Sequence, residues 1–78
     1  MLLFTTLGCH LCEQAQAMVR SVGAEPVLVE IANDDQLFER YGLRIPVLAF
    51  DPLGEPSQEL AWPFDEAELR QWLETAQT

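Results

Sequence analysis

The chain has 78 residues, and its thirteen acidic side chains face only four arginines and no lysine, which gives a formal net charge of −9. A chain of this length forms one domain, over residues 1–78, with a small core. Nucleic acids and anionic membranes bind basic surfaces, so the charge excludes both as partners. No apolar run approaches the roughly 18 residues of a membrane span, and no signal peptide is recognisable. We therefore expect a cytoplasmic protein and a monomer.

The first predicted elements are a strand, a helix and a second strand. Residues 2–6 are apolar and prone to β-structure, which is typical of a strand. A helix then runs from about 9–12 to residue 22 and ends at Gly23, and the β-branched run 26–31 predicts the second strand. The apolar side chains that recur at helical spacing, and that we expect to be buried, are Leu11, Ala15, Met18, Val19 and Val22.

A short helix and a third strand are predicted next. Asn33 is a good N-cap for a helix over about 34–41, which we expect to end at Gly42. Residues 47–50 are apolar and follow a proline, and they predict the third strand. The side chains that the short helix is expected to bury are Leu37, Phe38 and Tyr41.

The last third of the chain predicts a hairpin and a final helix. Residues 51–54 match a type I turn, and residues 57–62 predict a fourth strand that pairs with the third. Asp65 and Glu68 resemble a capping box at the start of a helix over about 65–76. This helix is expected to place Leu69, Trp72, Leu73 and Ala76 on its buried side and to pair Glu66 with Arg70 on its exposed side.

These elements predict an α/β chain in the order β-α-β-α-β-β-α. A right-handed crossover through the first helix makes the first two strands parallel, and the hairpin adds an antiparallel pair. The result is a four-stranded mixed sheet with helices on both faces. This is the layout of the minimal thioredoxin fold.

Two cysteines, Cys9 and Cys12, lie where the first strand gives way to the first helix. Their spacing brings two sulfurs within one helical turn, so they can form a disulfide. The free N–H groups and the dipole at a helix start stabilise a thiolate, and cysteine pKa values there fall to about 3.5–7.5. We therefore predict that Cys9 attacks a disulfide and that Cys12, one turn further in, resolves the mixed disulfide.

Other interpretations of the cysteine pair remain open. The two thiols could form half of a zinc site, could hold an iron–sulfur cluster shared between two chains, or could be inert. The chain has no second pair of Cys or His residues, whereas tetrahedral zinc needs four ligands. We therefore predict no bound metal.

Two segments together resemble glutaredoxins, and in particular short bacterial glutaredoxin-like proteins: Gly8-Cys9-His10-Leu11-Cys12 after a strand, and Arg44-Ile45-Pro46-Val47 before a later one. The resemblance covers nearly the whole chain. It implies thiol–disulfide oxidoreduction of a disulfide-containing protein or of glutathione, with no resident cofactor and glutathione as a possible co-substrate. It also implies a cis bond between Ile45 and Pro46, beside the cysteines, where Ile45 presents its backbone to the substrate.

The chain departs from glutaredoxins around the expected glutathione site. The usual lysine before the first cysteine is absent from residues 5–7, and the segment 61–65 replaces a glycine pair that helps to hold glutathione. We therefore expect weak glutathione binding. In that segment, Trp62 and Phe64 either line a substrate groove or pack under the last helix.

His10 and Arg44 are the remaining candidate site residues. His10 either tunes the pKa of Cys9 or is a spacer that faces solvent. Arg44 either stabilises the Cys9 thiolate, or a carboxylate of the substrate, or is an ordinary surface arginine. An alternative function for the whole chain is a non-catalytic thioredoxin-fold module that binds a partner protein through the Pro46 groove.

Overall fold

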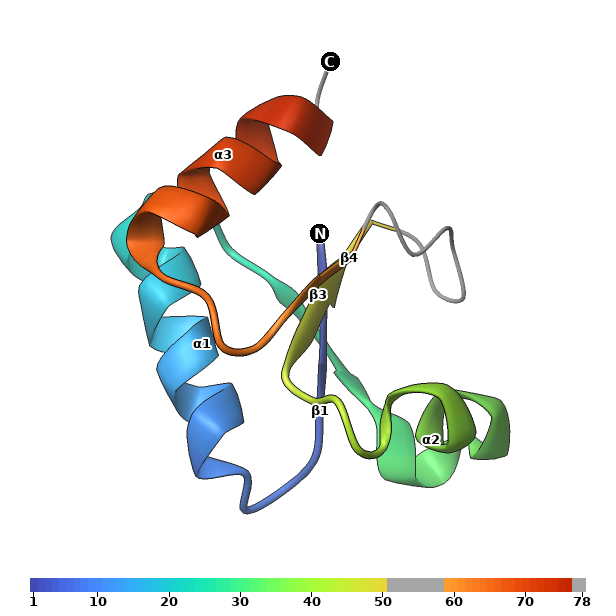
Figure 1. The fold of residues 1–78 in the computed structure, drawn as a ribbon. Helices are drawn as coiled ribbons and strands as arrows, with labels where there is room; N and C mark the ends of the chain where they lie inside the picture. Colours follow the sequence, from blue (N-terminus) through green and yellow to red (C-terminus); the bar gives the residue numbers. More distant parts are fainter. Residues whose placement is uncertain (51–58, 77–78) are drawn as a thin grey trace.

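The computed structural model describes residues 1–50 and 59–76, so the turn predicted over 51–54 lies outside the described residues. Figure 1 shows the central sheet with its helices. In chain order the described elements are β1 (Leu2–Thr5), α1 (His10–Ser21), β2 (Val27–Glu30), the 3-10 helix η1 (Ile31–Asn33), α2 (Asp35–Tyr41), β3 (Val47–Ala49), β4 (Glu59–Ala61) and α3 (Glu66–Ala76).

The four strands form one mixed sheet in the order β2-β1-β3-β4. β1 pairs with β2 in parallel, so that Thr5 lies opposite Glu30. β3 pairs antiparallel with both β1 and β4, and Val47 lies opposite Phe4. The ends of β1 and β2 and the start of β3 therefore meet at one end of the sheet. This is the end at which the two cysteines and the proline segment lie.

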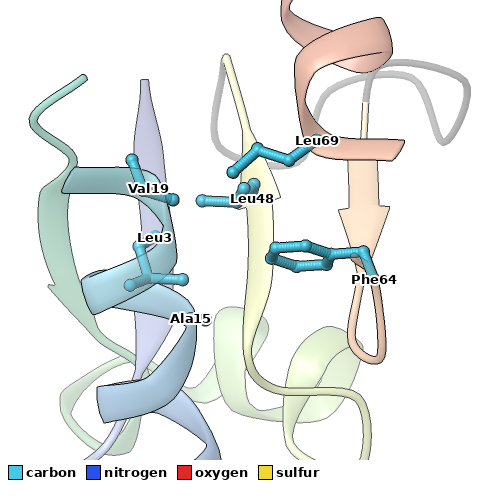
Figure 2. Packing of buried hydrophobic residues seen from close by; sticks show 6 residues of the cluster. All are labelled: Leu3, Ala15, Val19, Leu48, Phe64 and Leu69. Carbon is cyan, nitrogen blue, oxygen red and sulfur yellow. The ribbon is translucent and has the colours of Figure 1, made fainter. Parts of the chain in front are cut away.

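Helices cover both faces of the sheet. α1 and α3 lie on one side and α2 on the other (Figure 1). Figure 2 shows the core under α1 and α3, where the buried side chains come from β1, α1, β3 and the end of the chain: Leu3, Ala15, Val19, Leu48, Phe64 and Leu69. The core under α2 consists of Phe4, Ile31, Leu37, Tyr41, Val47 and Ala49. Adjacent residues of β1 and β3 thus serve opposite cores, because side chains alternate along a strand.

The predicted order of elements and the minimal thioredoxin fold are both confirmed. So is the start of α3, where the Asp65 N–H donates to Glu68 and the Glu68 N–H donates to Asp65, at 3.2 and 2.7 Å. On the exposed side of the same helix, Glu66 and Arg70 pair at 2.8 Å, as predicted. Gly23 follows α1 with a φ of +87°, a left-handed conformation that glycine adopts without strain.

Three local predictions are wrong. Asn33 does not cap α2, because it belongs to η1, and Asp34 takes that role by accepting the N–H groups of Gln36 and Leu37 at 2.9 and 3.1 Å. Phe38 is 58% exposed and Leu11 is 45% exposed, although both were expected in the core. In α1 the buried position next to Leu11 belongs to Cys12.

None of the helices within residues 1–50 and 59–76 is long and apolar enough to cross a membrane.

Candidate redox site

The loop between β1 and α1 places Cys9 at the start of the helix. Gly8 has a φ of +81°, a conformation that favours glycine, and the Cys9 N–H donates to the Thr6 carbonyl at 3.3 Å. Cys9 is the N-cap of α1, and its sulfur accepts the N–H of Cys12 at 3.1 Å. A sulfur in this position meets the free N–H groups of the first turn and the positive end of the helix dipole.

Cys9 and Cys12 are bonded to each other, with their Cα atoms 5.2 Å apart. Their exposure differs: Cys12 is buried, with 3% of its surface accessible, whereas Cys9 is half-buried. An incoming group therefore reaches the Cys9 sulfur more easily than the Cys12 sulfur. The pair can alternate between a disulfide and a dithiol without a large movement of the backbone, since both residues lie within the first turn of one helix.

The Ile45–Pro46 segment lies at the same end of the sheet, and its peptide bond is cis, as the resemblance to glutaredoxins implied. Pro46 is fully buried, and its carbonyl accepts the Trp62 N–H at 3.0 Å. The Ile45 N–H donates to the Tyr41 carbonyl at 3.0 Å, which ties this segment to the end of α2. A second cis bond, between Trp62 and Pro63, was not predicted.

His10 points into solvent from the first turn of α1. Its side chain is 92% exposed, and its Nδ1 lies 3.8 Å from the Glu13 carboxylate. The contact described for its ring is with Glu13 rather than with either sulfur, so its role in tuning Cys9 stays a prediction. The exposure of the His10 side chain is typical of a spacer that faces solvent, which is the second of the two interpretations.

Arg44 takes part in a polar cluster on the α2 side of the sheet. Its guanidinium lies 3.1 Å from the Glu59 carboxylate of β4 and 5.7 Å from the centre of the Tyr41 ring. The Glu59 side chain is only 2% exposed, accepts the Tyr41 hydroxyl, and also pairs with Arg40 at 3.6 Å. We call Arg40, Tyr41, Arg44 and Glu59 the Glu59 cluster. The sequence analysis missed Glu59, because a single glutamate in a short strand carries no local signal of burial.

Two aromatic residues of the segment 61–65, Trp62 and Phe64, pack against the core under α1 and α3. Phe64 is buried in that core and contacts the edge of the Trp62 ring at a centroid distance of 5.1 Å. Trp62 is partly buried against the same core. The interpretation in which Phe64 packs beneath the last helix is therefore the correct one for that residue.

Glu30 fastens the cysteine loop from the end of β2. Its carboxylate accepts the N–H groups of Leu7 and Ala32 at 3.0 and 3.1 Å. The hydrogen bond from Ala32, with others from the Thr6 side chain and from Leu7, lowers the pKa of Glu30 because each favours the charged carboxylate. Glu30 is thus an anion that holds the loop ahead of Cys9, and the sequence analysis did not identify it.

In the described part of the chain, no three His, Cys, Asp or Glu side chains group closely enough to hold a metal ion.

Comparisons with known proteins agree with this geometry. A family model described as "Glutaredoxin-like domain (DUF836)" matches residues 1–74. An X-ray structure of the structural genomics target protein XcR50 from X. campestris is similar, with 42% identity, a TM-score of 0.80 and 96% of each chain covered. A solution structure of the same target gives 44% identity and a TM-score of 0.72, and covers 97% of this chain and 96% of that one. No curated protein matches. With its cysteine pair at the start of the first helix and its cis-proline at the same end of the sheet, the chain belongs to the glutaredoxin-like domain family.

Proposed function

We propose that the protein is a thiol–disulfide oxidoreductase whose working groups are Cys9 and Cys12. One observation carries the proposal: the two cysteines are close enough to bond, yet they differ in exposure, with Cys9 at the helix start and Cys12 buried behind it. A purely structural disulfide needs no such asymmetry. A pair that exchanges with an external disulfide does, because one sulfur must meet the substrate and the other must wait within reach.

The reaction proceeds by two successive exchanges. The Cys9 thiolate attacks one sulfur of the substrate disulfide, forming a mixed disulfide and expelling the first substrate thiolate. The Cys12 thiolate then attacks the Cys9 sulfur, which releases the second substrate thiolate and leaves Cys9 and Cys12 bonded. Two electrons pass from the protein to the substrate, and the two protons of the protein thiols end on the two substrate thiols.

The start of α1 supports the first of these steps. The Cys12 N–H lies 3.1 Å from the Cys9 sulfur, and a reduced Cys9 can keep this hydrogen bond as a thiolate. Hydrogen bonds to the charged form lower a pKa, and the thiolate is the attacking species. Cys12 is buried, which favours its neutral thiol until the mixed disulfide has formed.

After one turnover the oxidised protein needs an external thiol to return to the dithiol. As the substrate, we favour a disulfide-containing protein over glutathione disulfide. Glutathione is an anionic peptide. The chain has no lysine, and Arg44, which belongs to the Glu59 cluster, is already paired with a carboxylate. Glutathione therefore remains a possible but poor co-substrate, and a glutaredoxin assay should give low turnover.

Alkylation of the reduced protein tests the proposal. Iodoacetamide near pH 6, followed by mass mapping, should modify Cys9 at least about tenfold faster than an unperturbed thiol, because a lowered pKa supplies thiolate at that pH. Cys12 should react much more slowly. A Cys9 that reacts no faster than a free cysteine peptide would contradict the proposal and would favour the non-catalytic module that binds partners beside Pro46.

A further inference from the structure

A cavity of about 290 Å³ opens beside the cysteine loop. Its wall includes Leu7 and Gly8 of the loop, Glu13 and Gln16 of α1, and Leu28 and Glu30 of β2. β1 separates β2 from β3 in the sheet, so the cavity lies on the β2 side of the cysteine loop and the Pro46 segment lies on the β3 side. A substrate bound over Cys9 would therefore contact the cavity on one side and the Pro46 segment on the other.

The cavity combines an apolar surface with two carboxylates. Leu7 is 93% exposed and Leu28 is 50% exposed, so neither is satisfied by packing within the described chain. Glu13 exposes 75% of its side chain, and the hydrogen bonds to Glu30 keep that group charged. A lining of this kind suits a ligand with an aliphatic part and a positive end.

No arginine of the chain is available to the two carboxylates of the cavity. All four arginines are in ion pairs: Arg20 with Glu25 at 3.0 Å, Arg40 and Arg44 with Glu59 at 3.6 and 3.1 Å, and Arg70 with Glu66 at 2.8 Å. Since there is no lysine, no arginine or lysine side chain remains to neutralise Glu13 and Glu30. The His10 ring, whose Nδ1 lies 3.8 Å from the Glu13 carboxylate, carries a positive charge only when it is protonated. A bound cation would complement this surface.

We infer that this cavity binds an arginine or lysine side chain that lies close to the disulfide of a substrate protein. The inference rests on the proposed function and names its substrate class. The aliphatic stem lies on Leu7 and Leu28 and the cationic head faces Glu13 and Glu30, as long basic side chains commonly do. A volume of about 290 Å³ is at the lower end of ligand pockets, which span about 300–1,000 Å³, and it suits one side chain better than a whole cofactor.

Single-turnover reduction of three matched peptides tests the inference. The peptides carry one disulfide and differ only at a neighbouring position, which is Arg, Gln or Glu, and pre-reduced protein is mixed with each. We expect the rate constants to fall from Arg to Gln to Glu, with the Arg peptide about tenfold faster than the Glu peptide at low salt. Because exposed charges are screened, the preference should shrink at about 0.5 M salt.

Charge-removing variants locate the preference. Glu13→Gln should lower the ratio of the Arg-peptide rate to the Gln-peptide rate about threefold. Glu30→Gln, made alone, should lower the same ratio by a larger factor. Glu74→Gln is the matched control: it removes the same charge from the last turn of α3, which lies at the end of the molecule away from the start of α1 (Figure 1), and it should leave the ratio unchanged.

Two outcomes would overturn the inference, and they differ in what else they overturn. Equal reduction of the three peptides, or a ratio that Glu74→Gln lowers as much as Glu13→Gln does, would remove the cationic substrate class and leave the oxidoreductase in place. Reduction of none of the peptides by the dithiol protein would remove the proposed function itself.

Discussion

The start of α1 and the Glu59 cluster lie on opposite faces of the sheet, and they handle charge in opposite ways. At the start of α1, His10 and Glu13 expose 92% and 75% of their side chains and lie 3.8 Å apart. In the Glu59 cluster, the Glu59 side chain is 2% exposed and lies within 3.6 Å of both Arg40 and Arg44. The polar side chains of the first region are exposed and can contact a ligand, whereas those of the Glu59 cluster pair with one another.

We interpret this difference as a division of roles within a small domain: the start of α1 serves the proposed reactivity, and the Glu59 cluster serves stability. A buried carboxylate without partners is costly, so Glu59 requires the arginines and the Tyr41 hydroxyl around it. The cysteine loop leaves N–H groups of the first turn without a backbone partner, and these are the groups that a thiolate needs. Arg40 and Arg44, half of the chain's arginines, pair with Glu59. In the proposed reaction, the helix start is therefore the main activator of Cys9.

The largest expected effect comes from removing the cysteine that this loop presents. Cys9→Ser should reduce disulfide reduction to the rate without protein, because the remaining cysteine, Cys12, is buried. Cys12→Ser should still attack but should stop at the mixed disulfide. Mass spectrometry after incubation with a disulfide peptide distinguishes the two. An adduct on Cys9→Ser, with none on Cys12→Ser, would reverse the assigned roles.

Opening the Glu59 cluster should cost stability. We expect Glu59→Gln to lower the free energy of unfolding by about 2–3 kcal/mol, less than for a fully buried pair because both arginines are partly exposed. Urea unfolding measures it. Glu66→Gln, which breaks an exposed arginine pair at 2.8 Å, is the matched control and should cost less than about 0.5 kcal/mol. Equal losses in the two variants would mean that burial of Glu59 adds nothing.

Arg44 links the two regions, because it follows the end of α2 and directly precedes the Ile45–Pro46 segment. We propose that Arg44→Ala raises the pKa of Cys9 by less than about half a unit, well below the one to three units of an unpaired neighbouring cation. The Glu59 carboxylate, 3.1 Å away and shared with Arg40, offsets part of its charge, and water screens the partly exposed guanidinium. In a Glu59→Gln background the same substitution should raise the pKa more. Thiolate absorbance against pH measures both, and identical titrations would return Arg44 to a structural role.

The smallest expected effect concerns Glu30 and acid. Its folded pKa lies below its unfolded value, so its contribution to stability is present above the unfolded pKa, about 4.3, and is lost as the pH falls through the folded value. Glu30→Gln should therefore destabilise the protein at pH 6 more than at pH 3, measured by urea unfolding. Glu74→Gln serves as the control. A destabilisation that is the same at both pH values would show that the hydrogen bonds act without the charge.

The sequence analysis succeeded where the signal lies within one element. Asp65 and Glu68 form their capping box within one helical turn. Gly23 takes a left-handed conformation just after α1, where the helix was predicted to end. The cysteine pair, too, was found from a spacing of three residues at the start of a helix. Local backbone geometry and hydrogen bonding decide these features, so a short stretch of sequence contains them.

It failed where apolar spacing alone could not rank the faces of a helix. Leu11 and Phe38 fit the helical pattern, but the sheet lies against other positions. In α1 Cys12 is buried beside the exposed Leu11, and in α2 only Leu37 and Tyr41 of the three predicted side chains are buried. The cap of α2 moved from Asn33 to Asp34 because β2 ends at Glu30 and a 3-10 turn fills the gap. In each case the placement of a neighbouring element moved the buried position or the cap by one to three residues along the chain.

By itself the sequence determined the strand–loop–helix that carries Cys9 and Cys12, the order of the elements and the excess of acidic residues, because composition, caps and spacing are local properties. Only the tertiary structure decided the partners across the fold. Glu59 meets Tyr41 and Arg44 from 18 and 15 positions away, and Glu30 holds Leu7 from 23 positions away. Those contacts depend on strand register and on the packing of α2 against the sheet. The same long-range packing paired Arg40 and Arg44 with Glu59 and placed Glu13 and Glu30 in one cavity beside the cysteine loop.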